Sequence, residues 1–146
     1  MRTASTATAF KYQATVPEIL AACADIHPVI DQADLDPTIR NLIYLRASQI
    51  NQCAFCINMH LRESRDHGES ETRLDQVIVW DQASVFTDAE RAVLAWTESL
   101  TVLNPRDDRA ALREQLVQHF TPTEIGAITA NIAMINLWNR INVSRH

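Results

Sequence analysis

Residues 45–60 of the 146-residue chain read LRASQINQCAFCINMH, and two helices are expected to meet within this stretch. The first is predicted from about 37 to 50, because Asp36 is a favourable N-cap and the proline after it suits a first helical turn. The second is predicted from about 52 to 66, with Gly68 as its C-terminal stop, since glycine readily adopts the left-handed conformation that ends helices. The stretch therefore joins two helices and carries two cysteines and a histidine.

The cysteines and the histidine share one face of the second predicted helix. Cys53 and Cys56 are three residues apart and His60 follows four residues later, so all three lie in one stripe. Residues three apart on a helix are roughly 5 Å apart between Cα atoms, which is within the range of a disulfide. Asn51 is expected to cap this helix and to place both cysteines in its first turn. The pair is therefore predicted to cycle between dithiol and disulfide with little backbone movement.

A cysteine in the first turn of a helix ionises readily. Unpaired backbone N–H groups and the helix dipole favour the thiolate there and lower a thiol pKa that is ordinarily about 8.5. His60 is placed to take the proton from Cys56, and Glu63 either orients His60 or is an ordinary solvated carboxylate. A thiolate beside a second cysteine can attack a peroxide oxygen, form a sulfenic acid and condense to a disulfide. The pattern predicts thiol redox chemistry.

Three other interpretations of the cysteine pair stay open. Zinc could be held by Cys53, Cys56 and His60, but the fourth ligand would have to be a distant residue such as His27 or His119. A thioredoxin-like site needs a strand–helix context that the sequence does not supply. The third interpretation is that both cysteines are inert core residues, and the position of His60 one turn after Cys56 argues against it. We expect no metal and no cofactor.

Helix-start signals recur along the rest of the chain. Capping boxes begin at Thr15, Thr87 and Thr121, each with glutamate three residues later. The predicted helices cover residues 15–30, 37–50, 52–66, 70–78, 88–103, 107–119 and 121–139. Two glycines in the whole chain are too few for a sandwich or barrel built on tight turns. The sequence therefore predicts an all-α, single-domain bundle of about seven helices over residues 15–146, after a loose N-terminal arm over residues 1–14.

Helical spacing also predicts which side chains are buried. The first helix is expected to bury a stripe that includes Ile19 and Ile26, and a later helix to bury its last residue, Leu103. Trp138 is interpreted as a core or interface anchor rather than a ligand-binding residue. His27 belongs to no recognisable constellation.

Charge and composition limit the partners. A formal net charge of −5 argues against a broad surface for nucleic acid or anionic membranes. No apolar run approaches the ~20 residues of a membrane span, and no signal peptide is visible. An odd count of three cysteines does not suggest a secreted disulfide framework. We expect a cytoplasmic protein that binds neither nucleic acid nor a membrane.

The stretch 45–60 resembles the core of the AhpD-like alkylhydroperoxidases, a group within the carboxymuconolactone decarboxylase superfamily. The likeness rests on the spacing Ser-x-x-Asn-x-Cys-x-x-Cys-x-x-x-His, which begins at Ser48. It extends through residues 86–96 and 135–140, and thus covers most of the chain from about Leu35 onward.

This resemblance implies an all-α fold, homotrimers or homohexamers, and reduction of hydroperoxides through the cysteine pair. It makes Cys56 the attacking thiolate and Cys53 the resolving cysteine, and it places His60 in a proton relay, with Ser48 and Asn51 in the same motif. Electrons would come from a dithiol donor, in some members a lipoylated protein.

Two positions depart from the family pattern. The relay usually includes a glutamate twelve residues before the first cysteine, and here that residue is Asn41, which cannot carry a proton. Some relatives have a histidine between the cysteines where this chain has Phe55. The incomplete relay keeps two alternatives to a hydroperoxide reductase in view. One is a redox-sensing or partner-binding protein with slow turnover, and the other is a decarboxylase-type lyase.

Overall fold

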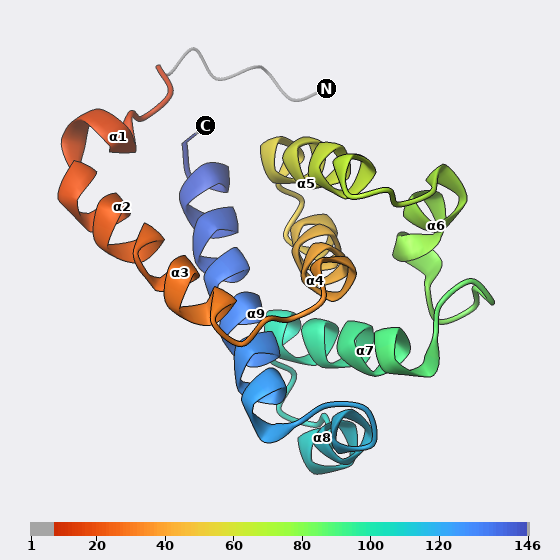
Figure 1. Ribbon diagram of the computed structural model, residues 1–146. Coiled ribbons are helices and arrows are strands. Elements are labelled where there is room, and N and C mark those ends of the chain that lie inside the picture. The colour runs from red at the N-terminus through yellow and green to blue at the C-terminus, as the bar shows by residue number, and fades with distance from the viewer. Residues whose placement is uncertain (1–7, 146) are drawn as a thin grey trace.

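The computed structural model describes residues 8–145, and every regular element within them is a helix (Figure 1). The elements in chain order are α1 (Tyr12–Thr15), α2 (Pro17–Ala24), α3 (Ile26–Asp31), α4 (Pro37–Ile50), α5 (Ala54–Asp66), α6 (Glu71–Gln76), the short 3-10 helix η1 (Val77–Val79), α7 (Asp88–Val102), α8 (Arg109–Val117) and α9 (Pro122–Val143). The predicted all-α bundle is confirmed. Its helices outnumber the predicted seven because the first predicted helix is divided into α2 and α3, and because α1 forms at the end of the predicted N-terminal arm.

Side-chain caps determine where the longest helices begin. Thr87 Oγ1 accepts the Glu90 N–H at 3.2 Å, and the Glu90 carboxylate accepts the Thr87 N–H at 2.8 Å, so the capping box of α7 is confirmed. The same reciprocal pair joins Thr121 and Glu124 at the start of α9, and Asp36 caps α4. Local signals in the sequence were sufficient here because each cap is satisfied within its own turn.

The predicted capping box at Thr15 is wrong. Thr15 is the last residue of α1, and its hydroxyl donates to the Lys11 carbonyl at 3.0 Å. Helix α2 begins at Pro17, and its N-cap, Val16, offers no side-chain acceptor. Proline suits the first turn of a helix, whereas a threonine hydroxyl can bond a carbonyl four residues earlier instead of capping.

Segments α1 to α3 form a strap that runs along one side of α9 (Figure 1). Ile19 and Ile26 were predicted to be buried but are 59% and 44% exposed. The break between α2 and α3 rotates the predicted stripe out of register, so Ile30 is buried against α9 while α2 buries no residue. The strap therefore covers α9 with one narrow face.

The N-terminal end of the strap is bonded to the C-terminal end of α9. The Phe10 N–H donates to the Arg145 carbonyl at 3.0 Å, and the hydroxyls of Tyr12 and Ser144 are 2.7 Å apart. The predicted loose arm covers residues 1–14. Its residues 1–7 lie outside the described part of the chain, and its last residues belong to α1.

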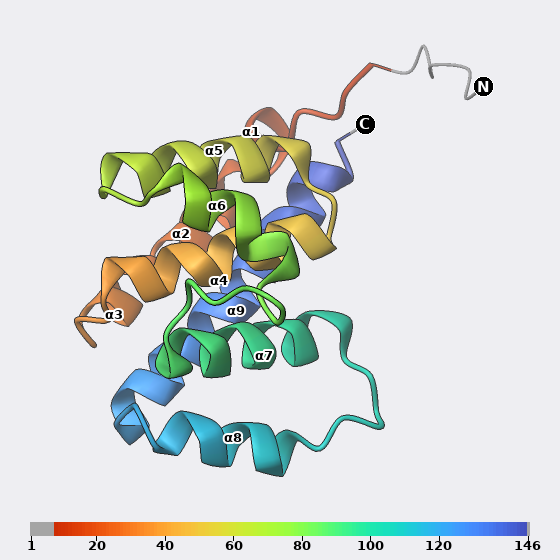
Figure 2. The ribbon, with the colours of Figure 1, turned by 90° about the vertical axis from the view of Figure 1, so that its right-hand side faces the viewer.

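Helix α4 lies in the middle of the bundle, between α5 and α7, with α9 packed along it (Figure 2). Ile43 and Ala47 belong to an apolar cluster shared with α7, α8 and α9. Leu42 and Leu45 belong to a second cluster shared with α6, η1 and α7. Complete burial of an Ile or Leu side chain is worth about 1.5–3 kcal/mol, so these two clusters hold α4 firmly. They also position its C-terminal end, where the cysteine turn begins.

Two helix ends differ from the prediction. Helix α9 continues past Asn139 to Val143. Helix α7 ends at Val102, and Leu103 adopts a left-handed conformation with φ of 56° and is 60% exposed, whereas burial was predicted. The chain leaves the helix at Leu103, so helical spacing no longer sets the direction of that side chain. Across residues 8–145, no helix has both the length and the apolar character needed to cross a membrane.

Candidate active site

The cysteine pair lies at the start of α5 and is joined in a disulfide, with Cα atoms 5.3 Å apart. Cys53 is the N-cap of α5, and its sulfur accepts the Cys56 N–H at 3.3 Å. The prediction that Asn51 caps this helix is wrong, because Asn51 is the C-cap of α4. Gln52 follows it in a left-handed conformation, with φ of 54°, so the chain becomes helical again only after Cys53. Both cysteines are buried.

Asparagine side chains anchor this turn to α9. Asn139 Nδ2 donates to Ser48 Oγ at 3.0 Å, and Asn51 Nδ2 donates to the Oδ1 atoms of Asn136 and Asn139, at 3.0 Å each. Asn136 Nδ2 donates in turn to Thr101 Oγ1 of α7 at 3.1 Å. Removing one partner would leave buried polar groups unpaired, at a cost of about 1–3 kcal/mol. Ser48 and Asn51, both singled out from the sequence, therefore belong to the hydrogen-bond network that holds this turn against α9.

His60 lies one helical turn after Cys56 and is 4% exposed. Its Nδ1 is 2.9 Å from Glu63 Oε2, so the carboxylate accepts the Nδ1 proton and leaves Nε2 with its lone pair. Nε2 is buried and has no hydrogen-bond partner among residues 8–145. Of the two roles considered for Glu63, the orienting one matches this contact. A buried acceptor without a donor is costly, so Nε2 is ready to take a proton from a neighbouring group.

The surroundings of His60 keep its ring neutral. Burial lowers the pKa of His60 below its ordinary value, and the hydrogen bond and negative charge of Glu63 act in the opposite direction. Tyr44 packs against the imidazole with ring centroids 5.0 Å apart. Burial also raises the pKa of Tyr44 to about 12, so its hydroxyl keeps its proton and donates to Asn131 Oδ1 at 2.6 Å. A neutral imidazole held in this way can act as a base near neutral pH.

Cys56 lines a pocket of about 290 Å³ between α3, α4, α5 and α9. Four aromatic rings and two apolar side chains line it with the cysteine: His27, Tyr44, His60, Trp138, Met59 and Ile135. Cys53 is not among its lining residues. Of the two sulfurs, that of Cys56 is therefore the one placed to meet a small molecule in the pocket.

The sequence analysis missed His27 and Trp138 as residues of this site. A signal for Trp138 was present, because Ile135, Trp138 and Asn142 recur at spacings of three and four and lie on one face of α9. His27 gave no such signal, because its place depends on how α3 crosses α9. The structure joins the two residues directly, since Trp138 Nε1 donates to His27 Nε2 at 2.8 Å.

Asn41 is buried on α4, and its Nδ2 lies 3.4 Å from His67 Nδ1. It lines a separate polar pocket of about 270 Å³ rather than the Cys56 pocket. The structure therefore brings together Cys53, Cys56, His60 and Glu63, and places Asn41 apart from them. In the described part of the chain, no group of three or more His, Cys, Asp or Glu side chains is arranged to hold a metal ion.

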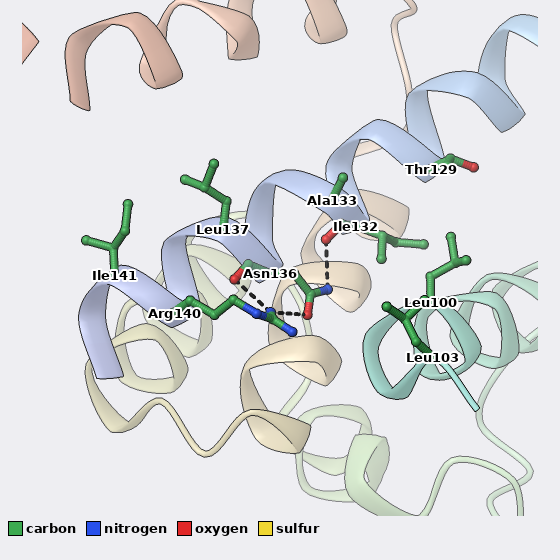
Figure 3. Close-up of a pocket in the computed structure, with 9 residues that line it drawn as sticks. All are labelled: Leu100, Leu103, Thr129, Ile132, Ala133, Asn136, Leu137, Arg140 and Ile141. Carbon is green, nitrogen blue, oxygen red and sulfur yellow. Dashed lines mark hydrogen bonds between the residues drawn. The ribbon is translucent and has the colours of Figure 1, made fainter. Parts of the chain in front are cut away.

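A larger hollow of about 730 Å³ lies between the end of α7 and another face of α9 (Figure 3). Its apolar lining, which we call the α7–α9 groove, consists of Leu100, Leu103, Ile132, Ala133, Leu137 and Ile141. Arg140 borders the groove and donates to the backbone and side-chain oxygens of Asn136. Among the described residues that line this hollow, Arg140 is the only one with an ionisable side chain. The groove therefore offers an apolar surface beside a single cation.

An all-α bundle with a cysteine pair that closes to a disulfide at a helix start, beside a buried histidine, is a helical thiol–disulfide protein. The chain belongs to the carboxymuconolactone decarboxylase family, whose sequence model matches residues 15–99. Within that superfamily it is AhpD-like, as the resemblance in residues 45–60 predicted.

Similar proteins cover nearly the whole chain. YdfG of Bacillus subtilis is 30% identical over 133 residues, which are 91% of this chain and 90% of YdfG. YnjA of Escherichia coli is 33% identical over 111 residues, which are 76% of this chain and 60% of YnjA. A crystallised protein of unknown function from Agrobacterium tumefaciens, suggested to be the antioxidant defence protein AhpD, is 38% identical, with a TM-score of 0.87 over 95% of each chain. The debrominase Bmp8 shares the fold at 17% identity, with a TM-score of 0.79 over 91% of this chain and 72% of Bmp8.

Proposed function

We propose that this protein is a cysteine-based hydroperoxide reductase that cycles Cys53 and Cys56 between dithiol and disulfide. One observation carries the proposal: Cys56 lines a pocket beside a buried histidine and is bonded to a second cysteine that does not line it. This is the division of labour that a peroxidatic and a resolving cysteine require. Membership of an AhpD-like family agrees with it.

The first step would oxidise Cys56. His60 Nε2 accepts the proton of the Cys56 thiol, and the thiolate attacks one oxygen of the hydroperoxide. The O–O bond breaks, the sulfur becomes a sulfenic acid, and the departing alkoxide takes the proton from His60 and leaves as an alcohol. The buried Nε2 without a partner supports His60 as this base, because the reduced thiol would supply the missing donor. The carboxylate of Glu63 would stabilise the imidazolium formed in between.

The second and third steps would regenerate the dithiol. The Cys53 thiol attacks the Cys56 sulfur, the S–S bond forms as the S–O bond breaks, and the hydroxyl group of the sulfenic acid leaves with the Cys53 proton as water. A dithiol donor then supplies two electrons and two protons and is itself oxidised to a disulfide. A lipoylated protein is a donor of the required chemistry, and a reducing compartment such as the cytoplasm would keep it available.

Glu63 takes the role of the relay glutamate that the family has at the position of Asn41. Its carboxylate bonds His60 on one side and is 46% exposed, so it connects the buried ring with solvent. Asn41 lies in another pocket and does not need to carry a proton on this route. The proposal therefore makes Glu63 the outer member of the relay.

Self-association forms part of the same proposal. We propose that the α7–α9 groove is covered by a neighbouring copy in a homotrimer or homohexamer. Leu103 supports this, because it adopts a left-handed φ that is uncommon for a non-glycine residue and its 60% exposed side chain adds to the apolar lining of the groove. Such a residue is better explained by contact with a partner than by the stability of a single chain.

Steady-state consumption of tert-butyl hydroperoxide with dithiothreitol or dihydrolipoamide tests the function. We expect Cys56→Ser to abolish turnover, and Cys53→Ser to allow one oxidation of Cys56 without disulfide formation. Cys23→Ser is the matched control, because Cys23 is a free cysteine on the strap, and it should keep full activity. Stoichiometric disulfide formation without turnover by any donor would indicate a redox sensor instead. Peroxide consumption that survives the loss of both cysteines would refute the proposal.

A further inference from the structure

Two of the aromatic rings that line the Cys56 pocket are bonded to each other. Trp138 Nε1 and His27 Nε2 are 2.8 Å apart, the two ring planes differ by 16°, and the ring centroids are 6.1 Å apart. A hydrogen bond between ring nitrogens lies in the plane of both rings, so the rings meet edge to edge rather than face to face. Together they form one nearly planar surface, which we call the His27–Trp138 platform.

Apart from Glu63 and Asn142, the side chains that line the rest of the pocket are aromatic, apolar or the cysteine itself. Met59 and Ile135 contribute apolar surface, and Tyr44 keeps its hydroxyl bonded to Asn131. A thioether adapts its shape to a ring and makes favourable contacts with aromatic edges. The pocket also contains the Cys56 sulfur and the imidazole of His60. It therefore offers a flat apolar surface and a reactive sulfur to the same small molecule.

The size of the pocket limits what can lie on that surface. Its volume of about 290 Å³ is at the small end of the ~300–1,000 Å³ that is typical of ligand pockets. Stacking against a planar wall favours a single ring over a branched alkyl group of similar polarity, because aromatic pairs attract beyond their buried area. Hydrogen peroxide would touch little of the wall and would gain nothing from it.

We propose that the pocket selects hydroperoxides that bear an aryl group on the peroxide carbon, with the ring lying on the His27–Trp138 platform and the O–O bond at Cys56. This inference rests on the proposed function and names its class of substrate. His27 and Trp138 are specificity-determining residues, since they act on the ring rather than on the peroxide group.

Two tertiary hydroperoxides test the inference in the full-length protein. Cumene hydroperoxide and tert-butyl hydroperoxide differ by a phenyl group in place of a methyl group and have similar peroxide chemistry. With dithiothreitol as reductant, we expect kcat/KM to be about 10- to 100-fold higher for cumene hydroperoxide. Trp138→Leu should lower this ratio about tenfold, and His27→Ala should lower it in the same direction.

Trp80→Leu is the matched control. Trp80 is bonded to Glu98 at 2.7 Å and stacks under Arg91, and it does not line the Cys56 pocket. The same substitution there should leave the ratio of the two kcat/KM values unchanged. His27→Ala removes half of the platform from the strap without altering α9, so it tests the inference even if Trp138→Leu folds poorly.

Binding of the alcohol products separates this inference from the proposed function. We expect 2-phenyl-2-propanol to bind the oxidised protein more tightly than tert-butanol in an NMR titration, and Trp138→Leu to remove the difference. Such binding without peroxide turnover would support the aryl site and overturn the reductase. Equal kcat/KM values for the two hydroperoxides, unchanged in Trp138→Leu, would overturn the aryl site and support the reductase.

Discussion

Helix α9 separates two hollows of opposite character. The α7–α9 groove is the larger, at about 730 Å³ against about 290 Å³ for the Cys56 pocket. Its lining is apolar apart from a few polar groups at its edge, whereas the Cys56 pocket contains a disulfide sulfur, a buried imidazole and a carboxylate. The smaller hollow, not the larger one, is lined by His60, whose buried Nε2 has no hydrogen-bond partner among the described residues.

The two hollows use different faces of one helix. Ile135 and Trp138 face the Cys56 pocket, while Ile132, Leu137 and Ile141 face the groove. Between them, Asn136 and Asn139 bond the cysteine turn and the end of α7. In the proposed function, this one helix carries a chemical face at the Cys56 pocket and an association face at the groove, and the two asparagines between them form a structural seam. Substitutions on each face should have separable effects.

The largest effect is expected on the chemical face. His60→Gln should slow the reaction of Cys56 with peroxide by about 10²–10⁴-fold, because a positioned base contributes that much to proton transfer. The rate constant is measured by stopped flow in the reduced protein at pH 7. His67→Gln, on the same helix, is the control and should leave the rate constant unchanged. A loss smaller than threefold in His60→Gln would mean that another group takes the proton.

The association face should respond to charge without loss of chemistry. Leu103→Asp should weaken self-association by about 2–4 kcal/mol, as the loss of a central interface residue typically does, and light scattering should show smaller particles. Val117→Asp is the control, because Val117 is also 60% exposed but lies on α8 outside the groove. A wild-type protein that is monomeric at micromolar concentration would contradict the proposed association.

The structural seam should show a loss of stability. Asn139→Ala removes a donor to Ser48 and an acceptor for Asn51, so the free energy of unfolding should fall by about 1–3 kcal/mol in urea denaturation. Asn58→Ala changes an exposed asparagine of α5 and should cost far less. Equal losses in the two variants would mean that the seam does not stabilise the fold.

The smallest effect is expected from pH. Burial holds the pKa of His60 below its ordinary value of about 6.5, so the unfolded chain gains a proton at a pH where the folded chain does not. The stability due to the neutral ring is complete above pH 6.5 and is lost as the pH falls to the pKa of the folded state. Thermal melts between pH 8 and 4 should show a slope that His60→Gln reduces. His119→Gln, at an exposed position, should leave the slope unchanged.

Local signals predicted the reactive face better than the surfaces around it. The spacing of Cys53, Cys56 and His60 was enough to place them together, because three and four residues along one helix fix neighbours. The caps of α4, α7 and α9 could likewise be read from single turns. The prediction of Asn51 as a cap was wrong because Gln52 adopts a left-handed conformation and the next helix begins after Cys53. A left-handed residue other than glycine is difficult to predict from the sequence.

Long-range packing explains the other misses. His27 reaches the pocket only because α3 packs against α9. Ile19 and Ile26 are exposed because they lie on two different helices of the strap, α2 and α3, whose buried faces do not continue into each other. Asn41 is near His67 because α4 and α5 pack against each other and bring the first turns of α4 beside the C-cap of α5. These outcomes depend on contacts between residues distant in the sequence.

The N-cap role of Cys53 has a kinetic consequence. Its sulfur is held against the first turn of α5 by the Cys56 N–H, so it stays beside Cys56 without a search through conformations. Well-oriented partners within one molecule react as if present at effective molarities of about 10⁵–10⁸ M. A sulfenic acid on Cys56 would therefore encounter Cys53 long before it met a second peroxide. Closure to the disulfide would outrun irreversible overoxidation, and the protein would survive the oxidant that it consumes.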